Sequence, residues 1–172
     1  MTNVREDIQT LEDLANLHPD QSGALKEFRE KHDLEHELSG KRAQKYGDSP
    51  DKRTLFFRDL AQRLWTDLGD QGGIALLDEL LFPEGKDAVF IDWRRQRLAY
   101  RPSTKLQAAF YVLLSNSHLA KRCANPDCAH PFFIGRRVDE RYCSDECKDI
   151  GRLATKRNWW SANRAKGTRG KR

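Results

Sequence analysis

All four cysteines of the 172-residue chain lie within 25 residues, in two close pairs with the spacings C-x4-C and C-x3-C. Thiolate pairs at such spacings are typical ligands of a structural metal ion, and four of them close a tetrahedral zinc site. We therefore predict one structural Zn²⁺ ion. A disulfide arrangement would need an oxidising compartment, which no feature of the sequence indicates. The predicted ligands are Cys123, Cys128, Cys143 and Cys147.

The residues around the cysteines predict the local backbone. Asn125-Pro126-Asp127 favours a tight turn that brings the first two thiolates together. Cys143 and Cys147 are four residues apart at the start of a helix-compatible stretch, which places both sulfurs on one helix face. Between the pairs, residues 130–134 and 139–142 indicate a short hairpin. Turn, hairpin and ligand-bearing helix follow in the order of a treble-clef zinc finger.

The net charge of +5 hides two opposite regions. Residues 1–120 have a net charge of −3, whereas residues 121–172 have 14 basic and 6 acidic residues, a net charge of +8. From Gly151 to the end there are eight basic residues and no acidic one. Such asymmetry is typical of nucleic-acid-binding proteins, because Lys and Arg release counterions from phosphates. A solubilising tail is the alternative.

The stretch from Ser144 to about Lys166 predicts one helix with two faces. One face is expected to pack on the hairpin or the preceding domain; it contains Ile150, Leu153, Arg157, Trp160 and Arg164. The other is expected to contact nucleic acid through Lys148, Arg152, Lys156, Trp159 and Asn163, with Thr155 between them. The cations would pair with phosphates, the indole would stack on a base, and the amide would hydrogen-bond. Alternatively, both tryptophans seal the finger against the N-terminal domain or a dimer partner.

The rest of the chain is predicted to be mainly helical. Apolar residues recur at helical spacing from Val4 to Leu17, and again in a second run to Leu38. Residues 39–51 are expected to form a loop before a helix from Leu55, and residues 88–101 a β-hairpin. We expect an α+β, mainly α fold. Its parts are a helical domain at 1–118, the finger and basic helix at 119–166, and a disordered basic tail at 167–172.

Two further patterns limit the class of protein. No apolar run approaches the roughly 18 to 20 residues needed to cross a bilayer. The first 13 residues contain five charged side chains where a signal peptide needs an apolar centre. We therefore expect a cytoplasmic protein without membrane contact. The N-terminal helices could also form a homodimer.

The finger resembles a known family in three elements: Cys123-Ala-Asn-Pro-Asp-Cys128, Phe132-Phe133, and Arg141-Tyr142-Cys143-Ser144 before a basic helix. Over about residues 119–160 it is similar to the bacterial CGNR-type zinc fingers, the C-terminal modules of proteins regarded as stress-related transcription regulators. The resemblance implies zinc ligation by the four cysteines and a regulatory role. The naming motif is only partly present, because Lys148-Asp149-Ile150 replaces Gly-Asn-Arg after the last cysteine. The family's DNA contact therefore does not transfer to these positions.

These observations lead to two hypotheses about function. The first is a zinc-binding protein that binds nucleic acid, DNA in preference to RNA, as a transcription regulator. The second is a zinc-stabilised interaction or scaffolding module without nucleic-acid binding. No enzymatic activity is expected: a treble-clef nuclease needs catalytic His and Asn residues, and His118 and His130 are the only histidines nearby, without paired carboxylates.

Overall fold

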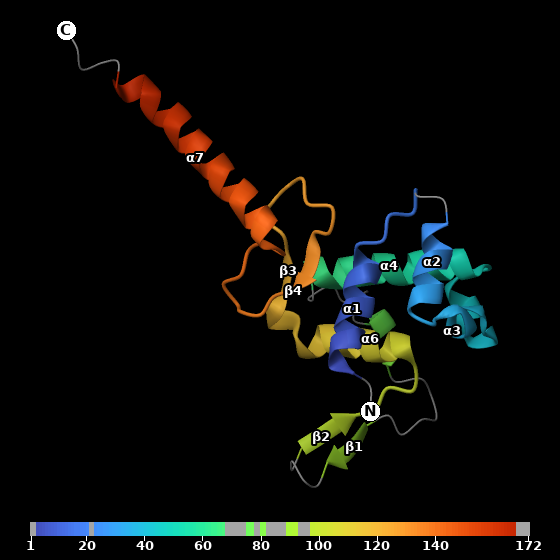
Figure 1. Cartoon of the computed structure of the whole chain (residues 1–172). Coiled ribbons are helices and arrows are strands. Elements are labelled where there is room, and N and C mark those ends of the chain that lie inside the picture. Colours follow the sequence, from blue (N-terminus) through green and yellow to red (C-terminus); the bar gives the residue numbers. More distant parts are fainter. Residues whose placement is uncertain are drawn as a thin grey trace.

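The computed structural model describes residues 3–20, 23–67, 75–77, 80–81, 89–92 and 97–167. The described part is mainly helical, with two short antiparallel strand pairs, so the predicted α+β, mainly α class is confirmed. In chain order the elements are α1 (Val4–Ala15), α2 (Ala24–Lys31), α3 (Glu35–Ser39), the 3-10 helix η1 (Lys41–Tyr46), α4 (Pro50–Thr66), β1 (Val89–Asp92), β2 (Arg97–Tyr100), α6 (Lys105–Ser115), the 3-10 helix η2 (Ser117–Leu119), β3 (Ala120–Arg122), β4 (Phe132–Ile134) and α7 (Asp145–Gly167) (Figure 1).

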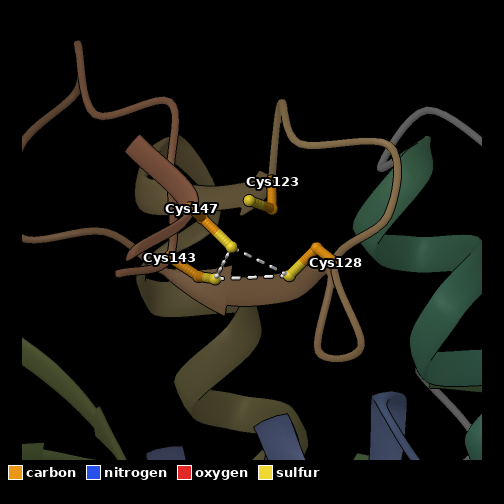
Figure 2. Close-up of side chains that lie close together, drawn as sticks. All are labelled: Cys123, Cys128, Cys143 and Cys147. Atoms are coloured by element: carbon orange, nitrogen blue, oxygen red, sulfur yellow. Dashed lines mark hydrogen bonds between the residues drawn. The ribbon is translucent and has the colours of Figure 1, made fainter. Parts of the chain in front are cut away.

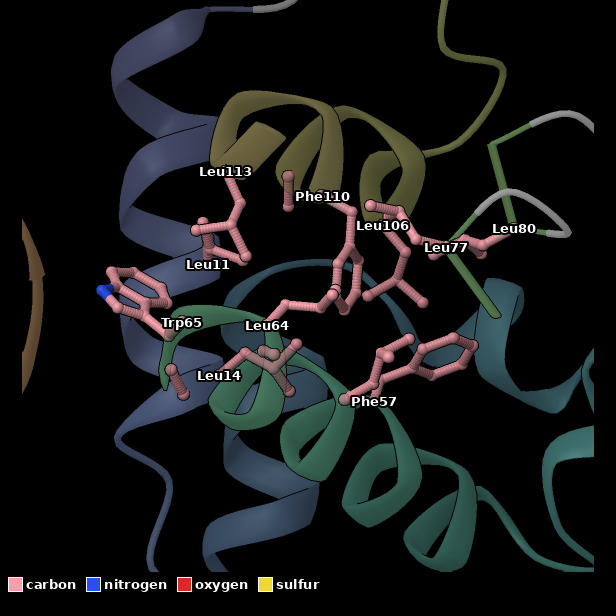
Figure 3. Packing of buried hydrophobic residues seen from close by; sticks show 14 of the residues in the cluster. Leu11, Leu14, Phe57, Leu64, Trp65, Leu77, Leu80, Leu106, Phe110 and Leu113 are labelled. Carbon is pink, nitrogen blue, oxygen red and sulfur yellow. The ribbon is translucent and has the colours of Figure 1, made fainter. Parts of the chain in front are cut away.

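The core of the helical part lies between α1, α4 and α6 (Figure 3). The predicted stripe of α1 supplies Leu11 and Leu14, which are almost completely buried. Leu64 of α4 and Phe110 and Leu113 of α6 fill the space between the helices. Each such side chain contributes roughly 1.5–3 kcal/mol by leaving water. This core is the platform on which the cysteine-containing segment is mounted.

The expected loop over residues 39–51 is wrong for most of its length. It contains η1, in which Ala43 is buried and the Tyr46 ring stacks on Phe56 with centroids 4.9 Å apart. α4 starts at Pro50, before the expected Leu55, because the Ser49 side chain accepts the Lys52 N–H at the helix start. The segment is polar in sequence but packs onto the helix that follows it.

A polar cluster joins α1 to the end of α2. The Asp13 carboxylate accepts hydrogen bonds from Lys31 Nζ at 2.6 Å and His32 Nε2 at 2.8 Å, and His32 Nδ1 lies 3.0 Å from the Thr10 hydroxyl. Burial alone would raise the pKa of Asp13, but the bonds from His32, Lys31 and Gln9 lower it well below its usual range. The charged form of Asp13 therefore stabilises the fold.

The predicted hairpin at 88–101 is confirmed by the pairing of β1 with β2, with Val89 opposite Tyr100. Its turn, residues 93–96, and residue 88 lie outside the described residues, as does the predicted basic tail from residue 168. Within the described part of the chain, no helix has the length and apolar character needed to span a membrane.

The second strand pair differs from the hairpin expected within the finger. β4 pairs with β3, placing Phe133 opposite Lys121, and residues 139–142 form no strand. Residues 137–140 instead form a turn closed by the bond from the Glu140 N–H to the Arg137 carbonyl, and the Glu140 carboxylate accepts the Arg136 N–H. With residues 139–142 folded back in this way, the strand partner comes from the segment before Cys123.

β4 contacts the helical part and the cysteine cluster through opposite faces. Alternation along the strand directs Phe132 and Ile134 to the helical core and Phe133 to the cysteines. Side chains at the end of α1 bind its backbone: Nδ2 of Asn16, the residue after α1, donates to the Phe132 carbonyl at 2.7 Å, and Asn16 Oδ1 accepts the Phe132 N–H at 3.0 Å. Glu12 Oε1 accepts the Ile134 N–H at 2.7 Å. These contacts fix the cysteine-containing segment to α1.

Candidate metal centre

The four predicted ligands converge on one point (Figure 2). All four Sγ atoms lie within 4.8 Å of one another, and three of the pairwise separations are 3.4, 3.6 and 3.7 Å. In a tetrahedral site with metal–sulfur bonds of about 2.3 Å, neighbouring sulfurs lie about 3.8 Å apart. All four cysteines are free thiols rather than disulfides. The geometry therefore fits one metal ion held by Cys123, Cys128, Cys143 and Cys147.

The first ligand pair is positioned by β3 and β4. Cys123 directly follows β3, and its N–H donates to the Pro131 carbonyl at 2.7 Å, which extends the strand pairing to the ligand itself. The predicted tight turn follows: the Asn125 side chain accepts the Asp127 N–H at 3.2 Å, and its carbonyl accepts the Cys128 N–H at 3.2 Å. This turn directs Cys128 back toward Cys123.

The second pair is positioned by the start of α7. The Ser144 hydroxyl accepts the Cys147 N–H at 3.3 Å and so caps the helix, as expected for a Ser at this position. Cys143 precedes the cap and Cys147 lies in the first turn, and their sulfurs are 3.7 Å apart. The i, i+4 spacing thus has the predicted effect.

The electrostatics of the cluster favour a bound cation. Asn125 is buried and its Nδ2 donates to Cys147 Sγ at 3.4 Å, which lowers the pKa of Cys147 to about 7. Burial raises the pKa values of Cys128 and Cys143, because negative charge is poorly solvated there. A divalent cation would compensate this charge and displace the thiol protons. Sequence reasoning gave Asn125 a role only in the turn and missed this contact with the sulfur.

Tyr142 and Gly151 form a contact that the sequence analysis also missed. The Tyr142 ring, partly buried beside the cysteines, lies across α7 at Gly151. A Cβ at residue 151 would lie 2.5 Å from Tyr142 Cζ and 2.6 Å from Cε1, so only glycine fits without movement of the ring. The sequence signal for this contact was a glycine one helical turn after the last ligand, together with an aromatic residue directly before the second cysteine pair.

The remainder of α7 projects away from the molecule (Figure 1). The face expected to pack is exposed: Ile150 is 48%, Leu153 55% and Trp160 51% accessible. Arg157 and Arg164 are exposed as well. This prediction is wrong because the helix axis points outward from the cysteine cluster, and the helical core is already covered by β4. The described chain therefore does not use the tryptophans to seal the finger against its N-terminal part.

The five residues predicted to contact nucleic acid lie along this projecting helix. Lys148 and Arg152 are loosely paired with Asp145 and Asp149, each at 3.9 Å, and such exposed pairs are weak. Lys156 and Trp159 are exposed. Asn163 is half-buried, and its Nδ2 donates to the Trp159 carbonyl at 2.8 Å, leaving its side-chain oxygen as an acceptor. The five residues thus lie along one helix.

Comparison of the chain with protein-family models, curated proteins and solved structures gives no match. The interpretation of the site therefore depends on its own geometry and chemistry: a four-cysteine cluster that fits a metal ion, and a cationic helix that starts at two of the ligands.

Proposed function

We propose that the protein binds one structural Zn²⁺ ion and uses α7 to bind nucleic acid, DNA in preference to RNA, as a regulator of transcription. The observation that supports it best is the exposure of nearly every side chain from Arg152 to Arg164 on a helix with six basic and three acidic residues. The resemblance to CGNR-type fingers is part of the proposal. We also propose that the protein is cytoplasmic and has no enzymatic activity.

Zinc is the metal that the cluster favours. Soft thiolates arranged as a tetrahedron select zinc or iron–sulfur chemistry, and a closed set of four leaves no open position for a substrate. The surrounding segment has a small core of its own, formed around Phe133 and the cysteines. Structural zinc contributes roughly 10–16 kcal/mol of binding free energy, which is enough to order a segment of this size.

Phosphate binding is supported by the charge on α7. No acidic residue follows Asp149, and Lys156, Arg157 and Arg164 have no ion-pair partner among the described residues. A helix of 23 residues is about 35 Å long and can follow several phosphates. Three contacts, from Lys148, Arg152 and Lys156, predict a slope of log affinity against log salt between about −2 and −3.

The test is a salt titration of nucleic-acid binding by the zinc-loaded, full-length protein and by the triple variant K148E/R152E/K156E. We expect the variant to lose binding at physiological salt and to keep one zinc per chain, because none of the three side chains belongs to the four-cysteine ligand set. Fluorescence anisotropy with labelled oligonucleotides measures the first property, and elemental analysis by mass spectrometry the second.

A matched control has the same change in net charge elsewhere: K26E/K41E/K52E replaces three exposed lysines of the helical part. It should bind as the unmodified protein does, with the same salt slope. Equal losses of nucleic-acid affinity in the two variants would show that net charge alone, and not the position of the lysines and arginine on α7, causes the loss. Unchanged binding by the α7 variant would refute the assignment of the helix.

One observation favours the second candidate function, an interaction module that docks on an acidic protein. Ile150, Leu153 and Trp160 form an exposed apolar stripe along α7, and helices with such stripes dock into protein grooves. Absence of binding to any oligonucleotide at micromolar protein would favour this function over the first.

A further inference from the structure

The two adjacent tryptophans of α7 form an exposed aromatic pair. Trp159 is 58% and Trp160 51% accessible, and the two indoles meet edge to face with centroids 5.0 Å apart and planes at 83°. Indoles are among the largest apolar side chains, and leaving two of them in water on a projecting helix is costly unless a ligand covers them. The pair therefore indicates a ligand with flat apolar faces.

The charges around the pair restrict the kind of ligand. Lys156 and Arg157 precede the tryptophans by one helical turn and Arg164 follows them by one turn, all three exposed. A second copy of α7 laid along this surface would bring like charges together. A nucleic acid supplies both flat faces and negative charge.

The geometry of the pair further restricts the nucleic acid. In a duplex, each base is covered above and below by its neighbours, so no face is free without unstacking, and all bases lie nearly parallel. Indoles at 83° to each other cannot both lie parallel to one such stack. Unpaired bases have free faces and independent orientations, and a flexible single strand can place one base on each indole.

From this arrangement we infer that Trp159 and Trp160 are a stacking platform for unpaired bases, and that α7 binds single-stranded nucleic acid in preference to duplex. The inference rests on the proposed function and names its ligand. The platform includes Trp160, which the sequence analysis had placed on the packing face. Lys156, Arg157 and Arg164 hold the phosphates of the same strand. DNA and RNA strands share this chemistry.

The experiment compares binding of the zinc-loaded, full-length protein to a labelled 20-nucleotide DNA strand, the RNA strand of the same sequence, and the DNA duplex. We expect at least one single strand to bind at least tenfold more tightly than the duplex. The variant W159A/W160A should lose at least tenfold in affinity for the single strand, since stacking on each base contributes about fivefold or more. Its affinity for the duplex should change less than twofold.

Two controls separate stacking from other effects. I150A/L153A removes exposed apolar side chains from the same helix and should leave single-strand affinity within twofold. W159F/W160F keeps two aromatic faces and should retain most of the affinity that the alanine variant loses. Stacking should also quench tryptophan fluorescence in the unmodified protein.

The outcomes distinguish this inference from the proposed function. Equal affinities for single strand and duplex, or an alanine variant that binds the single strand normally, would overturn the inference and leave nucleic-acid binding intact. Absence of binding to all three oligonucleotides would overturn both. Binding of only the DNA strand supports both the inference and the proposed function. Binding of only the RNA strand supports the inference and contradicts the preference for DNA in the proposed function.

Discussion

Gly151 is a position on α7 that requires a residue without a Cβ. The Tyr142 ring occupies the space that a Cβ would take at this residue. Glycine lowers helix stability, but here it allows the ring to pack directly on the backbone of α7. We predict that Gly151→Ala destabilises the finger by about 1–3 kcal/mol through overpacking, despite the better helix propensity of alanine. The measurement is zinc affinity by competition with a coloured chelator.

A double-mutant cycle tests the cause of that loss. If the ring is responsible, Gly151→Ala should cost nothing further in a Tyr142→Ala background. A gain in zinc affinity for Gly151→Ala alone would show that helix propensity outweighs the steric contact.

Asp13 is the residue from which we expect a pH dependence. Its hydrogen bonds to His32 and Lys31 keep its folded-state pKa below the unfolded value of about 3.9. The stabilisation is therefore present above pH 4 and declines as the pH falls below that value. Urea denaturation should show the stability difference between the unmodified protein and Asp13→Asn narrowing from pH 5 to pH 3. A difference that stays constant over this range would contradict the assignment.

At the level of elements, α7 differs from the core helices in how its stability arises. Isolated helices of about 12–15 residues are marginal in water, and residues 152–164 have almost no tertiary contact to support them. We predict that amides of Arg152–Arg164 exchange with solvent at least about 100-fold faster than those buried in α6. Hydrogen exchange followed by NMR measures this, and bound nucleic acid should slow the exchange. Equal protection of α6 and α7 in the free protein would be inconsistent with a free helix.

Sequence patterns predicted an element well where residues within that element alone determine its structure. The apolar spacing of α1 and the i, i+4 ligands of α7 each determine a local structure. The partner of β4 was not predictable in the same way, because strand-forming residues do not specify which strand they pair with. The direction of the α7 axis depends on how the whole cysteine cluster is oriented on the helical part. The spacing of residues within α7 gives no information about that orientation.

For the molecule as a whole, the metal and the helical core are expected to be coupled. Trp65 reports on the junction: its Nε1 donates to the Lys121 carbonyl at 3.0 Å, and its ring centroid lies 5.9 Å from that of Phe132. Removing the metal with a chelator should shift Trp65 emission to longer wavelength as this junction opens. Most of the far-UV helical signal should remain, because α1, α4 and α6 have their own core.

The W93F/W159F/W160F background leaves Trp65 as the tryptophan that emits in this measurement. The variant C143S/C147S in the same background should show the shifted emission without chelator and should not respond to it. Unchanged Trp65 emission after complete loss of the metal would show that the junction is independent of it. A homodimer through the N-terminal helices stays a prediction that sedimentation of the same samples can address.

The binding of the β4 backbone by Glu12 and Asn16 has a consequence for assembly. A strand with unpaired backbone groups is a template on which another chain can add a strand. In this protein the side chains of Glu12 and Asn16 bind three of those groups, the N–H and carbonyl of Phe132 and the N–H of Ile134, so a foreign strand would first have to displace them. Sheet extension between molecules is thereby opposed at β4, whereas the projecting part of α7 stays accessible to a partner.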